Sequence, residues 1–295
     1  MQKNQQKLLI VLALFSTYFI WGSTYFAIRL GIESFPPFLM AGARFSLAGL
    51  ILYVAMRYLG QPNPTLQQWR SSILIGIMLP ALGNGTVCYV QQTISSSLAA
   101  LSIATAPIWM ACFSSLWGHH PSKQEWLGIA IGFIGIVLLN ASGSLHGDPK
   151  STFLLMFAAA AWAFGSVWSK HLPMPQSFMA SATQMLCGGV VLLLFSTSQH
   201  EVWPEHISTR SWLAFLFLVL LGSIVAYSAY QYLLKKVRPL VATSNTFINP
   251  IVAFALGIGL INENVTRIEF IALAVIIVGV FLVLSFNEQG LEKRV

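Results

Sequence analysis

Charged side chains are scarce in this sequence: Asp, Glu, Lys and Arg make up 8% of the 295 residues, whereas 56% are hydrophobic. A water-soluble domain usually carries about 25% charged residues, because its surface must be hydrated. A chain of this length has enough residues for a core but too few charges to cover that core. The scarcity of charge excludes a soluble globular protein and indicates that lipid solvates most of the surface.

Motifs for catalysis, metal binding and disulfide formation are also missing. No HExxH, GxSxG or GxxxxGK[ST] sequence occurs, and no pair of carboxylates falls inside an apolar run. Cys88, Cys112 and Cys187 stand singly in apolar runs without a CxxC spacing, so we expect them to be buried as small hydrophobic residues. We therefore expect neither an enzyme nor a protein that binds a metal or another cofactor.

Apolar runs of about 20 residues fill most of the chain, which is the length that an α-helix needs to cross a bilayer. The sequence therefore predicts an all-α, polytopic membrane protein with ten transmembrane helices. The first run follows a short basic segment, but it is longer than the core of a signal peptide, and we interpret it as an uncleaved span. The predicted spans are residues 8–30, 37–59, 71–90, 96–117, 124–141, 151–170, 177–198, 211–234, 240–261 and 266–286.

The basic residues predict the orientation of these spans. If the N-terminus is cytoplasmic, 11 of the 16 Lys and Arg residues lie on the cytoplasmic side and four lie outside, with Arg44 inside a span. The positive-inside rule then places both termini in the cytoplasm. Because these charges are dispersed between apolar runs rather than gathered in one patch, the net charge of +7 does not indicate nucleic-acid binding.

The two halves of the sequence resemble one another. Residues 21–23 (WGS) in the first span align with residues 164–166 (FGS) in the sixth, and residues 105–108 (TAPI) in the fourth align with residues 248–251 (INPI) in the ninth. Each half holds five spans, an odd number, so the second half must enter the membrane from the opposite side. Such inverted-topology repeats are common in secondary transporters and bind substrate at the repeat interface near mid-membrane.

We therefore predict two inverted five-helix repeats, residues 1–145 and 146–295. Gly128 and Gly132 form a GxxxG spacing in the fifth span, which predicts a close helix-packing face.

Pro107 and Pro250 occupy matching positions of the two repeats, deep inside spans. Proline leaves a backbone carbonyl without its helical partner, so each should face protein or a wet cavity, unless it is only a tolerated kink. Asn249 and Asn245 add polarity on nearly the same face, as substrate contacts or as hydrogen bonds between helices.

Arg44 is the costliest residue to place in a membrane, about two turns into the second span. It either serves a cavity, where it would hold an anionic group or neighbouring carbonyls, or extends its side chain toward the outer interface. Asn84, between two glycines, is a further single polar group in apolar surroundings, and hydrogen bonding between helices is its alternative role.

Aromatic side chains at membrane depth favour a cavity for a flat or cationic substrate, although core packing explains them as well. Gly22 and Ser23 follow Trp21, where the missing side chain of Gly22 would allow a molecule to approach closely. The expected substrate-binding residues are Trp21, Gly22, Ser23, Tyr25, Arg44, Asn84, Pro107, Trp109, Trp162, Tyr230, Asn249 and Pro250.

These motifs resemble those of the EamA-type transporters in the drug/metabolite transporter superfamily. The resemblance rests on residues 20–26 (IWGSTYF), on PP at 36–37 followed by 40–45 (MAGARF), on 162–166 (WAFGS) and on 249–252 (NPIV), and it extends over essentially the whole chain. It implies ten helices in an inverted repeat, a location in the bacterial inner (plasma) membrane, and export from the cytoplasm through a central cavity.

The resemblance also implies that Trp21, Gly22, Arg44, Pro107 and Pro250 are at family-like positions around that cavity. One feature departs from the family, which often has a glutamate after the fourth and ninth spans. Glu263 fits the second position, but His120 occupies the first. A gating role for paired glutamates therefore does not carry over to this chain.

We expect a secondary transporter that exports small amphipathic metabolites or drugs by alternating access. A nucleotide-sugar or phosphorylated-metabolite antiporter is one alternative, although it would need more basic groups in the cavity than Arg44 supplies; a passive channel is another. The expected partners are a small-molecule substrate and the lipid bilayer, and two repeats in one chain make a monomer sufficient in principle.

Overall fold

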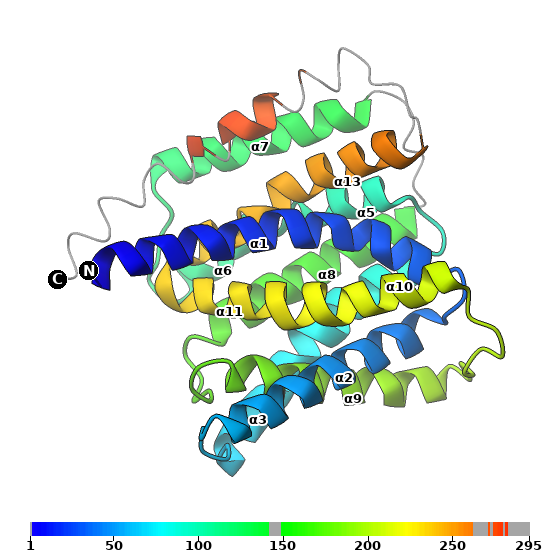
Figure 1. Ribbon diagram of the computed structural model, residues 1–295. Helices are drawn as coiled ribbons and strands as arrows, with labels where there is room; N and C mark the ends of the chain where they lie inside the picture. Colours follow the sequence, from blue (N-terminus) through cyan, green and yellow to red (C-terminus); the bar gives the residue numbers. More distant parts are fainter. Residues whose placement is uncertain (1, 142–148, 262–270, 272–273, 280, 283–295) are drawn as a thin grey trace.

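The computed structural model describes residues 2–141, 149–261, 271, 274–279 and 281–282, and these residues contain helices and no strands (Figure 1). The helices of the first half are α1 (Gln2–Gly31), α2 (Pro37–Tyr58), α3 (Leu66–Gly76), η1 (Ile77–Gly85), α4 (Thr86–Val90), α5 (Ser96–Ile103), α6 (Ala106–Ser115) and α7 (Lys123–Ala141). Those of the second half are α8 (Pro149–Trp168), α9 (Met179–Ser198), α10 (Thr209–Phe217), η2 (Leu218–Val225), α11 (Ala226–Lys236), α12 (Pro239–Thr243) and α13 (Asn245–Ile261).

Six helical segments of the described chain are long and apolar enough to cross a membrane. They are Asn4–Gly31, Pro37–Tyr58, Leu66–Val90, Lys150–Trp168, Met179–Ser198 and Thr209–Lys236. They coincide with the first, second, third, sixth, seventh and eighth predicted spans. The tenth predicted span, residues 266–286, and Glu263 lie largely or wholly outside the described residues.

The fourth and ninth predicted spans are each divided into two helices, which the sequence did not predict. α5 ends before a turn at Ala104 and Thr105, and Pro107 lies in the first turn of α6. Amide groups in the first turn have no acceptor within their own helix, so the missing amide hydrogen of Pro107 breaks no helical hydrogen bond. α12 and α13 are divided at Ser244, whereas Pro250 lies inside α13. Pro250 cannot donate to the carbonyl of Thr246, four residues earlier. The two aligned prolines therefore have different structural effects.

The third and eighth spans each contain a π-helical segment, η1 and η2, between two α-helical pieces. Each span begins at a hydroxyl cap: Thr65 Oγ1 accepts from the amide of Gln68 at 3.3 Å, and Ser208 Oγ accepts from the amide of Ser211 at 3.2 Å. π-Helical turns widen a helix locally and are frequent at functional sites.

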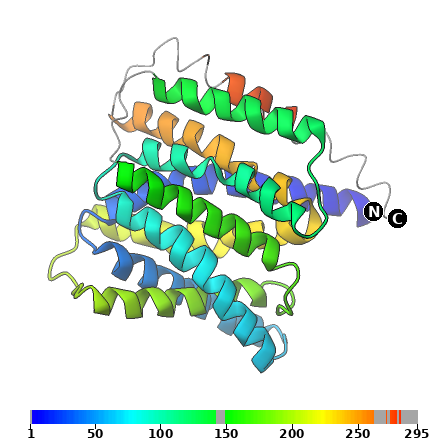
Figure 2. The ribbon, with the colours of Figure 1, turned by 180° about the vertical axis from the view of Figure 1, so that it is seen from behind.

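Glycines allow the two halves to approach closely where α2 packs along α9. A Cβ atom added at Gly49 would lie 2.6 Å from the amide nitrogen of Leu186, and one at Gly189 would lie 2.5 Å from that of Ser46. Figures 1 and 2 show α2 and α9 at one edge of the bundle and α7 at the opposite edge. The α2–α9 pair is thus a closely packed contact, remote from α7.

The predicted packing face on α7 is confirmed. A Cβ atom at Gly279 would lie 2.5 Å from the amide nitrogen of Gly132 and 2.8 Å from the carbonyl oxygen of Gly128. The prediction for the cysteines is only partly correct, because Cys88 is buried, Cys187 is half-buried and Cys112 is exposed on the outside of the bundle. In lipid an exposed thiol is not penalised as it would be in water.

Candidate functional site

A cavity lies inside the helical bundle, between helices of both halves. The space open to the centre of a water-sized sphere is about 60 Å³. One water molecule needs about 10–15 Å³ by this measure, so the cavity admits a small cluster of waters in this conformation. Its lining residues are Trp21, Thr24, Tyr25, Ile28, Arg44, Phe45, Gly83, Asn84, Val87, Ile103, Ala106, Ala158, Trp162, Gly222, Tyr227, Asn245, Thr246 and Asn249.

Aromatic rings form one wall of this cavity. Trp21 on α1 and Trp162 on α8 meet edge to face, with ring centroids 5.4 Å apart and an interplanar angle of 84°. Trp21 also donates from Nε1 to the carbonyl oxygen of Gly222 at 3.0 Å, which fixes the ring against η2. Edge-to-face pairs of this kind are favourable beyond their buried area, so the wall is a preformed surface for a flat molecule.

Arg44 places a cationic group in the same cavity. Its side chain is 1% exposed, so the alternative in which Arg44 extends toward the outer interface is wrong. Nε donates to Ser223 Oγ at 2.9 Å, and Cζ lies 4.4 Å from the centroid of the Phe45 ring. Nη1 is buried without a hydrogen-bond partner in the protein. A guanidinium is costly to bury unpaired, so this donor requires water or a bound acceptor.

Two asparagines supply unpaired acceptors to the cavity. Asn245 and Asn249 are each 2% exposed, and the Oδ1 atom of each has no hydrogen-bond partner in the protein. A buried acceptor without a partner destabilises the fold by about 1–3 kcal/mol unless it is satisfied. These oxygens are therefore suited to receive N–H or O–H groups from water or a ligand.

The structure places the twelve residues that the sequence singled out in two groups. Six line the cavity: Trp21, Tyr25, Arg44, Asn84, Trp162 and Asn249. The other six lie behind it or elsewhere in the bundle. Tyr230 is directly behind the aromatic wall, 5.1 Å from Trp21 between ring centroids, and its hydroxyl is hydrogen-bonded to Ser166 at 2.8 Å.

The remaining five do not line the cavity. A Cβ atom at Gly22 would lie 2.5 Å from Cβ of Val252, so the bare side of this glycine faces α13. Ser23 donates to the carbonyl of Phe19 on its own helix at 2.7 Å. Trp109 stacks on Phe113 with ring centroids 6.1 Å apart, beside a separate apolar cluster. Pro107 and Pro250 are buried beside cavity-lining neighbours without lining it themselves.

Several lining residues were not among the predicted site residues. Thr246 and Tyr227 are polar side chains three residues before Asn249 and Tyr230, which the sequence did single out. Their helical spacing from these predicted residues could have identified them as candidates. Ile28, Val87 and Ala158 carry no signal, because an apolar residue in a span is equally suited to lipid, core or cavity.

Comparison with known proteins agrees with this architecture. The model of the EamA-like transporter family matches residues 8–141 and again residues 149–285. The chain is 44% identical over 272 residues to the uncharacterized inner membrane transporter YedA of Escherichia coli K12, covering 92% of this chain and 89% of YedA. It is also 25% identical over 281 residues to a probable amino-acid metabolite efflux pump of Salmonella typhimurium, covering 89% of this chain and 90% of that protein.

A solved crystal structure with 18% sequence identity has the same fold, with a TM-score of 0.74 over 95% of this chain and 98% of that one. The long apolar helices, the apolar exterior of the bundle and the two family matches all indicate a membrane protein of this family. The chain is therefore a multi-pass membrane protein that belongs to the EamA-like transporter family, and it is a transporter rather than an enzyme.

Proposed function

We propose that this chain is a ten-helix secondary transporter of two inverted repeats, with both termini in the cytoplasm. It exports small amphipathic metabolites across the bacterial inner membrane by alternating access. The observation that carries the proposal is the cavity itself, which lies between helices of both halves and combines aromatic walls, one buried cation and unpaired amide oxygens.

Three pairs of lining residues support the repeat. Ile103 and Thr246 are 143 residues apart, the spacing that aligns Pro107 with Pro250, and both line the cavity. The same spacing relates Ala106 to Asn249 and Asn84 to Tyr227. The two separate matches of the family model, to residues 8–141 and 149–285, support this division. Symmetry-related halves can exchange conformations and so expose one site to each side in turn.

The chemistry of the lining favours a substrate with one anionic group. Arg44 is the only charged residue among the described lining residues, so it can neutralise a carboxylate but not a diphosphate. The acceptors Asn245 and Asn249 suit an ammonium or amide group, and the indole rings suit a flat apolar body. An amino acid has this combination of groups. The similarity to a probable amino-acid metabolite efflux pump supports the same class.

Efflux measurements with three related compounds test the proposal. Cells that express the protein, and cells with an empty vector, are loaded with labelled phenylalanine, N-acetylphenylalanine or phenylalaninamide. We expect the protein to accelerate efflux of phenylalanine most and of phenylalaninamide least, because the amide lacks the carboxylate for Arg44. A protonophore should abolish efflux against a gradient.

Other outcomes point to the alternatives. Flux that only dissipates a gradient would indicate a passive channel, and exchange of a nucleotide sugar for its nucleoside monophosphate in proteoliposomes would indicate an antiporter. Failure to move any member of a broad panel of amino acids, purines and cationic dyes would contradict the proposed export.

A further inference from the structure

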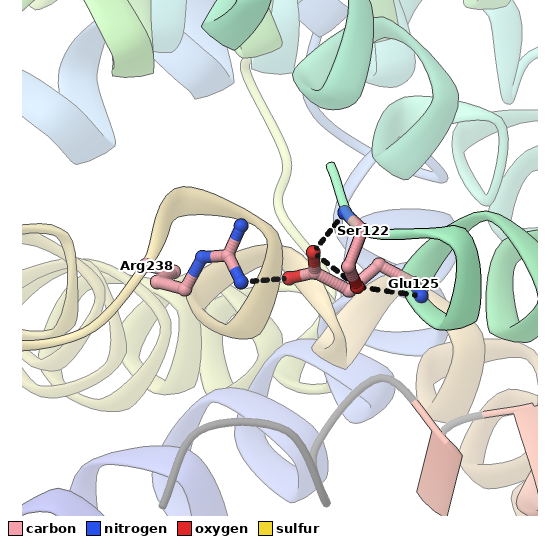
Figure 3. A network of polar contacts seen from close by, with 3 residues as sticks. All are labelled: Ser122, Glu125 and Arg238. Atoms are coloured by element: carbon pink, nitrogen blue, oxygen red, sulfur yellow. Dashed lines mark hydrogen bonds and ion pairs between the residues drawn. The ribbon is translucent and has the colours of Figure 1, made fainter. Parts of the chain in front are cut away.

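An ion pair joins the two halves at one end of the bundle. Arg238 Nη1 lies 2.8 Å from Glu125 Oε1, and the Glu125 side chain is 1% exposed while that of Arg238 is 38% exposed (Figure 3). Glu125 lies in the first turn of α7, in the first half, and Arg238 immediately precedes α12, in the second half. A carboxylate this deeply buried must keep polar partners, because burying it alone is strongly unfavourable.

Glu125 has a second partner that belongs to its own helix. Its Oε2 atom accepts from the backbone amide and the hydroxyl of Ser122, at 2.8 and 3.0 Å, and its own amide donates to Ser122 Oγ at 3.2 Å. Ser122 and Glu125 thus form a capping box, with one carboxylate oxygen on the cap and the other on Arg238. The carboxylate therefore keeps hydrogen bonds if Arg238 moves away, so the ion pair can break without leaving a bare buried charge.

The ion pair lies at one end of the bundle, on the side away from the contact between α2 and α9. Figure 1 shows that α7 begins, and α11 ends, at the end of the bundle where the N-terminus lies, and that α7 is at the opposite edge from α2 and α9. Glycines at backbone distance also hold α7 to the second half, because a Cβ atom at Gly279 would lie 2.5 Å from the amide nitrogen of Gly132. Glu125 precedes this glycine contact in the first turn of α7, so a tilt of α7 about the contact would separate Glu125 from Arg238.

A short segment connects the ion pair to the cavity. α12 (Pro239–Thr243) begins directly after Arg238 and ends at the turn on Ser244, whose hydroxyl lies 2.7 Å from that of Tyr18 on α1. The cavity-lining residues Asn245 and Thr246 follow this turn at once. A displacement of α12 would therefore change both the ion pair and the polar side of the cavity.

We propose that the Glu125–Arg238 ion pair is a cytoplasmic gate, which closes the cytoplasmic end of the cavity when formed and breaks each time that end opens. The inference rests on the proposed alternating access. At the repeat position of Arg238, 143 residues earlier, stands Ser95, which carries no charge. The corresponding ion pair therefore cannot form on the outer side, and this asymmetry favours the conformation that is closed to the cytoplasm.

The experiment measures how accessible the cavity is from the cytoplasm. Cys88, Cys112 and Cys187 are replaced by Ala or Ser in a background whose efflux is first compared with the wild type, and Thr246→Cys introduces one thiol in the cavity. Inside-out and right-side-out vesicles are treated with a membrane-impermeant maleimide, and the labelling rates are compared.

Glu125→Gln is the informative variant, because glutamine preserves the capping box but removes the charge. We expect Glu125→Gln and Arg238→Gln each to raise labelling in inside-out vesicles by roughly three- to tenfold, with no further rise in the double variant. The exchange Glu125→Arg with Arg238→Glu should return the rate toward the background value. Lys236→Gln, which removes a neighbouring exposed cation, is the matched control and should leave labelling unchanged.

A second measurement does not depend on the labelling rate. In a Glu125→Cys, Arg238→Cys variant, a reducible bifunctional thiol reagent should stop efflux, and reduction should restore it. Unchanged labelling in Glu125→Gln, or full efflux in the cross-linked variant, would overturn the gate. If labelling responds as expected but the background protein exports no compound, the proposed substrate class fails while the gate stands.

Discussion

Arg44 and Ser223 connect the two halves beside the cavity: Nε of Arg44 on α2 donates to Oγ of Ser223 on η2 at 2.9 Å. The bond uses one edge of the guanidinium and leaves the buried Nη1 atom without a protein partner. Ser223 lies in the π-helical segment of the eighth span, where the backbone departs from regular α-helical spacing. The pair thus holds a cation inside the membrane with part of its hydrogen-bonding capacity unused.

The first prediction concerns Arg44. Arg44→Ala should reduce efflux of an anionic or zwitterionic substrate by roughly ten- to a hundredfold, the loss expected when a hydrogen bond to a charged group is removed. Membrane abundance, measured by immunoblot, should fall far less. Arg210→Ala, which removes an exposed arginine from α10, is the control and should change neither quantity. Equal losses of efflux and abundance in Arg44→Ala would make Arg44 a folding residue.

The second prediction separates the two contributions of Trp21. Trp21→Phe keeps an aromatic ring beside Trp162 but removes the hydrogen bond to Gly222, whereas Trp21→Ala removes both. We expect Trp21→Phe to lower efflux by a few-fold and Trp21→Ala to lower it by roughly thirtyfold, because an aromatic pair and a neutral hydrogen bond contribute about 1 kcal/mol each. Trp126→Ala, at an exposed position on α7, is the control. Efflux at the wild-type rate in Trp21→Ala would show that Trp21 only packs.

The positions of most spans could be predicted from the sequence, because the bilayer fixes both the length and the polarity of a crossing helix. The breaks inside spans could not. Pro107 and Pro250 look alike in sequence, yet Pro107 begins a helix while Pro250 lies within one. The π-helical turns η1 and η2 were not predicted either: η1 contains Pro80, which cannot donate a helical hydrogen bond, but η2 contains no proline to mark it.

The candidate site was predictable from two signals, amphipathic aromatic residues at membrane depth (Trp21, Tyr25 and Trp162) and polar groups whose burial is costly. Arg44, Asn84 and Asn249 attracted attention because polar groups in a span need partners, and all three line the cavity. Gly22 shows the limit of this reasoning. Its sequence context indicates that another group packs closely against Gly22, but it does not tell a ligand from a neighbouring helix. In the structure the neighbouring group is the side chain of Val252 on α13.

That contact gives the third prediction. If Gly22 lined the cavity, as the sequence predicts, Gly22→Leu would block the cavity by its bulk, but the structure indicates a packing defect instead. Even a Cβ atom would lie 2.5 Å from Val252, so Gly22→Leu should separate α1 from α13 and lower membrane abundance. Gly22→Leu combined with Val252→Gly, which removes the Cβ atom in this contact, should recover part of the abundance. A variant that is fully abundant but inactive would restore the interpretation as a cavity block.

The last prediction tests the glycine contact between α2 and α9. A Cβ atom at Gly189 would lie 2.5 Å from both the amide nitrogen and Oγ of Ser46, and 3.0 Å from the carbonyl oxygen of Gly42. Because two of these three atoms belong to the backbone, the helices must move apart, and we expect Gly189→Ala to destabilise the protein by about 1–3 kcal/mol. Its Tm in detergent should therefore fall by roughly 3–10 °C. Leu47→Ala, at an exposed position of α2, is the control and should shift the Tm little. A Tm for Gly189→Ala equal to that of the wild type would contradict this close contact and show that α2 and α9 can separate enough to admit a methyl group.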